Sequence, residues 1–285
     1  TSHSPYVIEQ FEPGDIVPLH RRGDELIGSP IDATAIKAKT YRTESRQFAE
    51  AILSRAVLIV EGATELVVFS AASNALERLG RPGYTHIDLS GVSLFNAKND
   101  STVKKFAPVF KSMNKRVYGV WDRPRGTDTA TAVQGADDSA DLPTAAFDRF
   151  WESPETGIER VLVKQTSTAV LRRFLDDVAT REDYPRSIVY TAATPDDDLE
   201  SVACEVLKAR KGDNWPYVEL LFDKMETIDE IPRFVRDVLL AIDADLAMAP
   251  EEPAGMGSDD APAAEKAGSE ISSEEERALP VDPGV

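Results

Sequence analysis

Hydrophobic residues along the chain alternate between strand-like and helix-like spacing. Residues 56–60 (AVLIV) form a continuous apolar run, which is typical of a central parallel strand covered on both faces. Residues 43–54 have the spacing of a helix that leads into this strand, and residues 64–79 predict a helix after it. Further strands are expected at 85–89, 116–121 and 160–163, and further helices near 101–114, 167–179, 197–210, 214–226 and 231–247. Alternating strands and helices predict an α/β fold, a mainly parallel sheet flanked by helices with a C-terminal helical part.

Composition changes this picture at the C-terminal end. The 285 residues are 42% hydrophobic, which is enough for a large core, and the formal net charge is −18. Residues 248–285 hold ten acidic and two basic residues, a net −8, with no aromatic residue. Such a segment cannot bury enough apolar surface to offset its ordering entropy, so we expect a disordered acidic tail.

The same counts exclude several classes of protein. A single cysteine, Cys204, excludes internal disulfides and a zinc site built on thiolates, and the three histidines lie too far apart to suggest a ligand cluster. No stretch approaches the ~20 apolar residues of a membrane span, and the N-terminus lacks a signal-peptide pattern, so we expect a cytoplasmic protein without a membrane partner. The acidity argues against nucleic-acid binding over the whole surface and leaves only a local site.

One segment reverses the charge. Between residues 98 and 125 there are eight basic and two acidic residues, a net +6 that we call the basic segment. A solvated helix face is the ordinary interpretation of such a run, and a local phosphate-binding surface is the alternative. Its basic residues are Lys98, Lys104, Lys105, Lys111, Lys115, Arg116, Arg123 and Arg125.

Carboxylates occur where the predicted strands end. Glu61 follows the first strand, and Glu65 lies four residues later. Asp88 lies within the expected second strand, and Asp122 follows the third. Side chains just past the carboxyl ends of parallel strands converge on one crevice, and clustered oxygen ligands without His or Cys suit Mg²⁺ or Mn²⁺. The alternative is that Glu61 only caps the amides of the following helix.

These motifs resemble a known family. Residues 57–65 (VLIVEGATE), followed by an apolar strand that ends at Asp122, resemble the Toprim domain, the α/β metal-binding fold of topoisomerases, primases and related nucleases. The second acid and the helix-strand lead-in at 48–60 are similar to the OLD (overcoming lysogenization defect) family of ATP-dependent endonucleases. Residues 1–6 (TSHSPY) look like the switch-histidine segment that ends an ABC-type ATPase domain. Three later stretches resemble the family's acidic and lysine motifs, namely residues 198–201, 207–212 and 231–232.

The resemblance implies roles for five residues. Glu61 and Glu65 would be metal ligands or a metal-linked general base, and Asp122 would be a metal ligand. Glu200 would belong to a second metal site, and Lys211 would stabilise charge on the scissile phosphate. Two Mg²⁺ or Mn²⁺ ions would activate water and stabilise the leaving oxygen. The implied activity is Mg²⁺-dependent cleavage of DNA, in anti-phage defence or DNA repair.

It also implies an ATPase partner. His3 would contact the γ-phosphate of ATP, yet the chain contains no GxxxxGK[ST] loop, so ATP would act only through an ATPase domain of the same or a partner polypeptide. The full-length protein would be a homodimer. The implied divisions are an ATPase remnant at 1–28, a linker and lead-in helix at 29–54, a Toprim core at 55–166, a helical part at 167–247 and the tail at 248–285.

The chain departs from the family pattern after the third strand. The family usually has Asp-x-Asp there, whereas residues 122–124 read Asp-Arg-Pro. Asp128, Asp137 or Asp138 could substitute, or the protein is a catalytically reduced module that binds nucleic acid or a partner. A primase-like or RNA-cleaving enzyme is a third possibility, disfavoured by the ATPase-like opening. With DNA as substrate, the basic residues expected at the mouth of the cleft are Lys98, Lys104, Lys105, Arg123 and Arg125.

Overall fold

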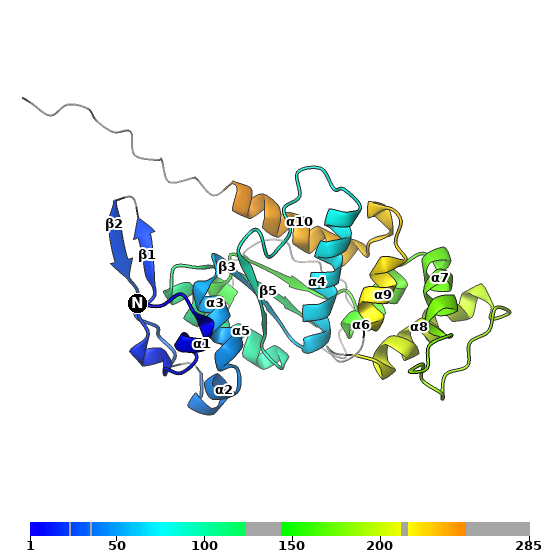
Figure 1. Cartoon of the computed structure of the whole chain (residues 1–285), viewed down its shortest axis with the longest axis horizontal. Helices are drawn as coiled ribbons and strands as arrows, with labels where there is room; N and C mark the ends of the chain where they lie inside the picture. The colour runs from blue at the N-terminus through cyan, green and yellow to red at the C-terminus, as the bar shows by residue number, and fades with distance from the viewer. Residues whose placement is uncertain (23, 35, 123–143, 212–215, 249–285) are drawn as a thin grey trace, which may run out of the picture. The chain divides into compact units, whose positions relative to one another are not determined.

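A four-stranded parallel sheet lies at the centre of the fold. The computed structural model describes residues 1–22, 24–34, 36–122, 144–211 and 216–248. The sheet has the order β4-β3-β5-β6, and every neighbouring pair is parallel (Figure 1). The predicted α/β architecture is therefore confirmed. The strands are β3 (Ala56–Val60), β4 (Val92–Asn96), β5 (Arg116–Trp121) and β6 (Arg149–Glu152).

Helices surround this sheet, and a two-stranded antiparallel hairpin precedes it. The hairpin strands are β1 (Leu19–Arg22) and β2 (Glu25–Gly28). The α-helices are α1 (Pro5–Ile8), α2 (Ala38–Thr43), α3 (Ser45–Leu53), α4 (Ala63–Arg78), α5 (Asp100–Ser112), α6 (Ile158–Lys164), α7 (Thr168–Val178), α8 (Asp196–Ala209), α9 (Tyr217–Asp223) and α10 (Arg233–Ala247). Short 3₁₀ turns lie at Pro13–Asp15, Thr144–Ala146 and Ile228–Glu230.

Strand β3 is covered on both faces, as its continuous apolar run predicts. All five of its residues are fully buried. Because side chains alternate along a strand, Ala56, Leu58 and Val60 enter one core, and Val57 and Ile59 enter the other. A strand in this position has no polar face, which explains why its sequence shows no alternation.

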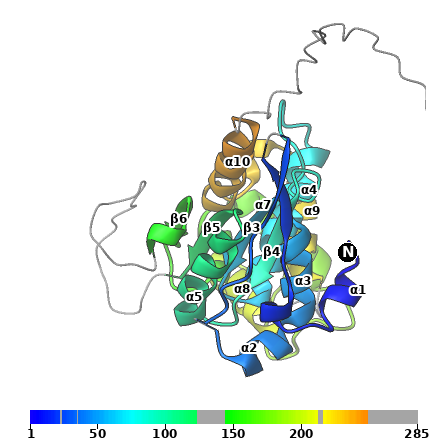
Figure 2. The same cartoon turned by 90° about the vertical axis from the view of Figure 1, so that its left-hand side faces the viewer.

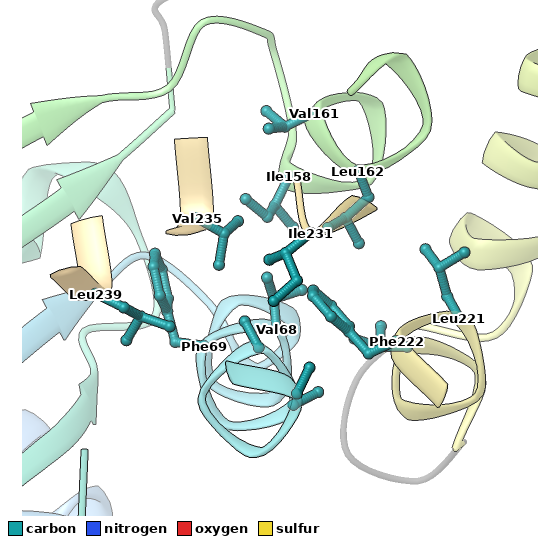
Figure 3. Close-up of a cluster of buried hydrophobic side chains, with 14 of the residues drawn as sticks. Val68, Phe69, Ile158, Val161, Leu162, Leu221, Phe222, Ile231, Val235 and Leu239 are labelled. Atoms are coloured by element: carbon teal, nitrogen blue, oxygen red, sulfur yellow. The ribbon is translucent and has the colours of Figure 1, made fainter. Parts of the chain in front are cut away.

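The first core joins the sheet to the C-terminal helices. Figure 3 shows Val68 and Phe69 of α4 beside Ile158 of α6, Phe222 of α9 and Val235 of α10. The segment predicted as a helical part therefore packs directly on the sheet, and the described residues form one compact unit with it. The boundaries implied inside that unit stay predictions, and the acidic tail lies outside the described residues.

The second core is aromatic and lies under α3 and α5. Phe95 of β4 contacts Phe106 and Phe110 of α5 at centroid distances of 4.5 and 5.1 Å, and Phe48 of α3 lies 5.4 Å from Phe110. The N-terminal segment reaches the same core through Ile8 of α1. In Figure 2 the hairpin β1–β2 and α1 stand on the near side of the sheet, the side of α3.

Two predicted strands are wrong. Residues 85–89 are an irregular segment followed by a turn, and the strand begins only at Val92, after Gly91 with its φ of +73°. Residues 160–163 belong to helix α6, while the fourth strand is the earlier segment Arg149–Glu152. A short apolar run such as Val161–Val163 fits a buried strand or a buried helix equally, and Gly157 with its φ of +105° precedes the helix.

The other predicted elements agree with the structure within a few residues, and β5 occupies residues 116–121 as expected. The helix predicted at 214–226 is shorter, because α9 spans Tyr217–Asp223. No helix in the described part of the chain is both long and apolar enough to cross a membrane.

Candidate functional site

The carboxyl ends of the four strands form one polar edge. Hydrogen bonding continues past the strands there, since the Ala97 N–H donates to the Val60 carbonyl at 2.9 Å and the Ser153 N–H to the Trp121 carbonyl at 2.8 Å. Glu61 follows β3 at this edge, and Asp122 follows β5. Asp88 was expected here as well, but it precedes β4 and therefore lies at the opposite end of that strand.

Glu61 and Asp122 are in contact. The backbone N–H of Asp122 donates to Glu61 Oε2 at 3.2 Å, and both residues are half-buried. This hydrogen bond fixes the Glu61 side chain across the gap between β3 and β5. The structure thus brings together two of the residues that the sequence singles out, although they lie 61 positions apart.

Glu65 lies beneath this edge in the first turn of α4. Only 9% of the residue is exposed. Gly62 leaves room for the carboxylate, because a Cβ at that position would lie 2.8 Å from Glu65 Oε2. Burial raises the pKa of Glu65 to about 7; a bond from its own backbone N–H opposes this, and the charges of Asp122, Glu159 and Glu61 add to it. Glu65 can therefore exchange a proton near neutral pH.

Glu159 is a site residue that sequence reasoning missed. It lies in the first turn of α6, is 7% exposed, and its charge acts on Glu65. The incorrect strand at 160–163 excluded Glu159 from the predicted site. A residue that precedes a parallel strand lies at the amino end of that strand, away from acids that follow the carboxyl ends. Gly157, two residues earlier, was the available signal in the sequence that a helix begins at this point.

The donors at this edge suit a hard divalent cation. All are carboxylates, and Mg²⁺ is commonly held by one or two carboxylates together with water. In the described residues, no group of three His, Cys, Asp or Glu side chains is already placed around one metal position. Asp128, Asp137 and Asp138, the substitutes expected for the absent second acid, lie outside those residues together with Arg123 and Arg125.

Glu200, Lys211 and His3 are not joined to this edge by hydrogen bonds or ion pairs between described residues. Glu200 is exposed on α8, and Lys211 is exposed just after that helix. Helix α8 packs on α6 and α7. His3 is exposed in the segment before α1. Their expected roles stay predictions.

Lys98 lies just after β4, and Lys104 lies on α5. Lys98 follows the carboxyl end of β4, with a φ of +69° that is unusual for a side chain of this size. Its N–H donates to Asn96 Oδ1 at 2.8 Å, and its ammonium lies 3.6 Å from Glu44, which is 5% exposed. The Lys104 ammonium lies 5.2 Å from the ring centroid of Trp121, the residue before Asp122. Lys105 is exposed on α5.

Three other basic residues of the segment have partners at the opposite end of the sheet. Lys111 pairs with Asp148 at 2.7 Å, and Arg116 donates to the Asp245 carbonyl at 3.3 Å. Lys115 is 8% exposed and donates to the Ser54 carbonyl. Three of the eight basic residues therefore have partners away from the carboxyl edge, and Arg123 and Arg125 lie outside the described residues.

The order of the sheet and the acids after β3 and β5 define a Toprim-type α/β module. Residues 52–123, which include β3, α4, β4, α5 and β5, match the family model described as "Overcoming lysogenization defect protein-like, TOPRIM domain". Residues 52–123 are therefore similar to the OLD-like Toprim domain, and the predicted resemblance is confirmed. No curated protein matches the chain.

Two solved structures are similar to this chain. One is the C-terminal region of the Burkholderia pseudomallei OLD protein, 16% identical, with 68% of this chain and 98% of that one covered and a TM-score of 0.43. The other is the C-terminal region of the Xanthomonas campestris pv. campestris OLD protein, 16% identical, with 70% and 96% covered and a TM-score of 0.44. Because these identities and TM-scores are low, the assignment of the Toprim-type fold rests on the family-model match and on the strand order of the sheet.

Proposed function

We propose that this protein hydrolyses phosphodiester bonds of DNA with Mg²⁺ or Mn²⁺, under the control of an ATPase domain. The observation that supports this most is the hydrogen bond between the Asp122 N–H and Glu61 Oε2 beside the buried Glu65. These three carboxylates lie in the segment that matches the OLD-like Toprim model. Cytoplasmic location, dimerisation and a role in anti-phage defence or DNA repair belong to the same proposal.

Each acidic residue of the candidate site has a role in the proposed mechanism. Glu61, Glu65 and Asp122 would hold the cation, and Glu200 would contribute to a second ion. When bound, the ions would activate water and stabilise the leaving oxygen. The Asp122 N–H keeps Glu61 oriented, and Glu65 with a pKa near 7 can take or release a proton while no cation is present.

Basic residues would bind the phosphates in this proposal. Lys211 would stabilise the negative charge that develops on the scissile phosphate. Lys98, Lys104 and Lys105, with Arg123 and Arg125, would contact neighbouring phosphates of the DNA backbone. His3 would contact ATP held by the ATPase domain.

Plasmid nicking by the protein together with its ATPase domain tests this function. We expect Glu61→Gln to lower the nicking rate by at least about a hundredfold in Mg²⁺ and in Mn²⁺, because it weakens a direct cation ligand. Glu77→Gln is the matched control, since Glu77 is exposed on the same helix as Glu65. Nicking by Glu61→Gln at the wild-type rate would overturn the mechanism.

A catalytically reduced module is the second candidate. It is favoured by the Asp-Arg-Pro sequence at 122–124 and by the lack of a ready three-ligand group in the described residues. Calorimetric titration with Mn²⁺ discriminates the two functions. Binding at two sites supports the nuclease, and no binding at millimolar concentration supports the module.

A further inference from the structure

A closed set of polar contacts surrounds Lys98 at the carboxyl end of β4. The Lys98 N–H donates to Asn96 Oδ1 at 2.8 Å, and the Asn96 N–H donates to Gln47 Oε1 at 2.9 Å. The Gln47 amide donates to Glu44 Oε2 at 2.9 Å, and the same oxygen lies 3.6 Å from the Lys98 ammonium. These four residues, which we call the Lys98 ring, join the start of α3 to the segment between β4 and α5.

The supporting residues of the Lys98 ring are buried, whereas the lysine is not. Asn96 is 2% exposed and Glu44 is 5% exposed, while 52% of the Lys98 side chain is exposed. An ammonium group carries three donor hydrogens, so the Lys98 ammonium beside Glu44 keeps donors for a group on its exposed side. A lysine held in this way has already lost part of the rotamer freedom that binding a ligand would otherwise remove.

Lys98 adopts a backbone conformation that does not suit lysine. Its φ of +69° lies in the left-handed region, which glycine and asparagine enter more easily. Either of those residues would make a purely structural turn here with less strain. Residues held in such conformations are typical of functional sites, where the surrounding structure keeps them in place. The conformation of Lys98 therefore indicates that its side chain has a function.

The register of the sheet places the Lys98 ring beside the candidate site. Asn96 is the register partner of Val60, and Glu61 directly follows Val60. The Ala97 N–H donates to the Val60 carbonyl, so β3 and β4 stay paired up to the residue before Lys98. A cation at this position can attract a phosphate next to the one that the strand ends would bind.

We propose that Gln47 and Asn96 are positioning residues, which hold Lys98 in the orientation that binds a phosphate of the DNA backbone. The inference rests on the proposed function for the identity of this ligand. Gln47 links two sides of the Lys98 ring, since its Oε1 accepts from Asn96 and its Nε2 donates to Glu44. Gln47 and Asn96 carry no charge, and both act through Lys98.

Binding of a fluorescently labelled DNA duplex, followed by anisotropy, tests the inference on the full chain. Ca²⁺ replaces Mg²⁺ because it also takes oxygen ligands, and gel electrophoresis afterwards checks that the duplex is uncut. We expect Gln47→Met to weaken DNA binding about three- to tenfold without a change of net charge. In the Lys98→Ala background the same substitution should change the affinity by less than about twofold, because the lysine that Gln47 positions is absent.

Gln165→Met is the matched control for Gln47→Met. Gln165 is also half-buried, and its Oε1 accepts the Phe234 N–H at 2.7 Å, outside the Lys98 ring. The control removes an equivalent hydrogen bond, and it should leave DNA affinity unchanged in both backgrounds. A general loss of packing would lower the affinity with and without Lys98, whereas loss of positioning lowers it only when Lys98 is present.

Three results would overturn the inference. These are wild-type DNA affinity in Gln47→Met, an equal loss of affinity in the wild-type and Lys98→Ala backgrounds, or a wild-type chain that binds no DNA. Should Gln47→Met fail to fold, Asn96→Ala, which removes the acceptor for the Lys98 N–H, provides the same double-mutant cycle. Coupling between Gln47 and Lys98 in a protein that binds DNA but never nicks it would refute only the proposed function, and nicking without coupling would refute only the inference.

Discussion

The buried Lys115 predicts a change of the free energy of unfolding with pH, and the size of this change can be calculated. It is 8% exposed between α5 and β5, and its ammonium donates to the Ser54 carbonyl. Burial lowers the pKa of Lys115 from 10.5 to about 8. Below pH 8 the folded and unfolded chains are both protonated here, and the cost of the buried charge is fully present. As the pH rises toward 10.5 only the folded chain loses the proton, so stability increases.

The magnitude follows from these two pKa values. Each pKa unit corresponds to about 1.4 kcal/mol, and the two titration curves give the wild type a gain of about 2 kcal/mol between pH 7 and 9.5. The window ends at 9.5 because tyrosines act in the opposite direction at higher pH. Burial raises the pKa of Tyr41 and Tyr118 to about 12, so unfolding becomes easier once tyrosines ionise in the unfolded chain.

Urea unfolding at pH 7, 8, 9 and 9.5 measures the effect as a difference between variants. Lys115→Met should lack the gain, while Lys105→Met, which changes an exposed lysine, should retain it. Comparing variants cancels the repulsion that alkaline pH adds to a chain of net charge −18. Parallel stability curves for wild type and Lys115→Met would refute the reasoning.

Three further predictions concern packing, phosphate binding and the buried acid. Gly119→Ala should destabilise the fold by about 1–3 kcal/mol in urea unfolding, because the new Cβ collides with the Phe147 ring; Gly14→Ala, with open space around it, should be neutral. Lys98→Ala should reduce the slope of log DNA affinity against log salt by about one, measured by fluorescence anisotropy. Glu65→Gln in EDTA should abolish a stability loss, on the order of 3 kcal/mol in the wild type, as the pH rises from 4.5 through about 7.

The sequence predicts those elements that local patterns determine. The run at 56–60 has no polar position, and the structure explains why, since β3 is buried from both sides. The acids after β3 and β5 could be placed at one edge because parallel strands share their direction. Nothing in the sequence reports the Asp122 N–H bond to Glu61, because it depends on which strands are neighbours.

The failures come from short apolar runs whose tertiary surroundings decide their form. Val161, Leu162 and Val163 are all buried in the core of α4 and the C-terminal helices, and a helix presents them there as well as a strand would. That single error removed Glu159 from the candidate site. It also placed the fourth strand at the wrong residues, because the alternating pattern of β6 is only four residues long and is not recognisable in the sequence.

The division of the basic segment limits how DNA could approach the site. Lys111, Lys115 and Arg116 have partners at the other end of the sheet, which leaves Lys98, Lys104 and Lys105 as the other basic residues of the segment in the described part of the chain. Four acids lie at that edge, Glu61, Glu65, Asp122 and Glu159. A phosphodiester that approaches these carboxylates directly is repelled by them, because like charges at short range repel strongly. In the proposed function a divalent cation would therefore bind before the scissile phosphate does. The lysines would then orient the DNA strand that binds to the cation.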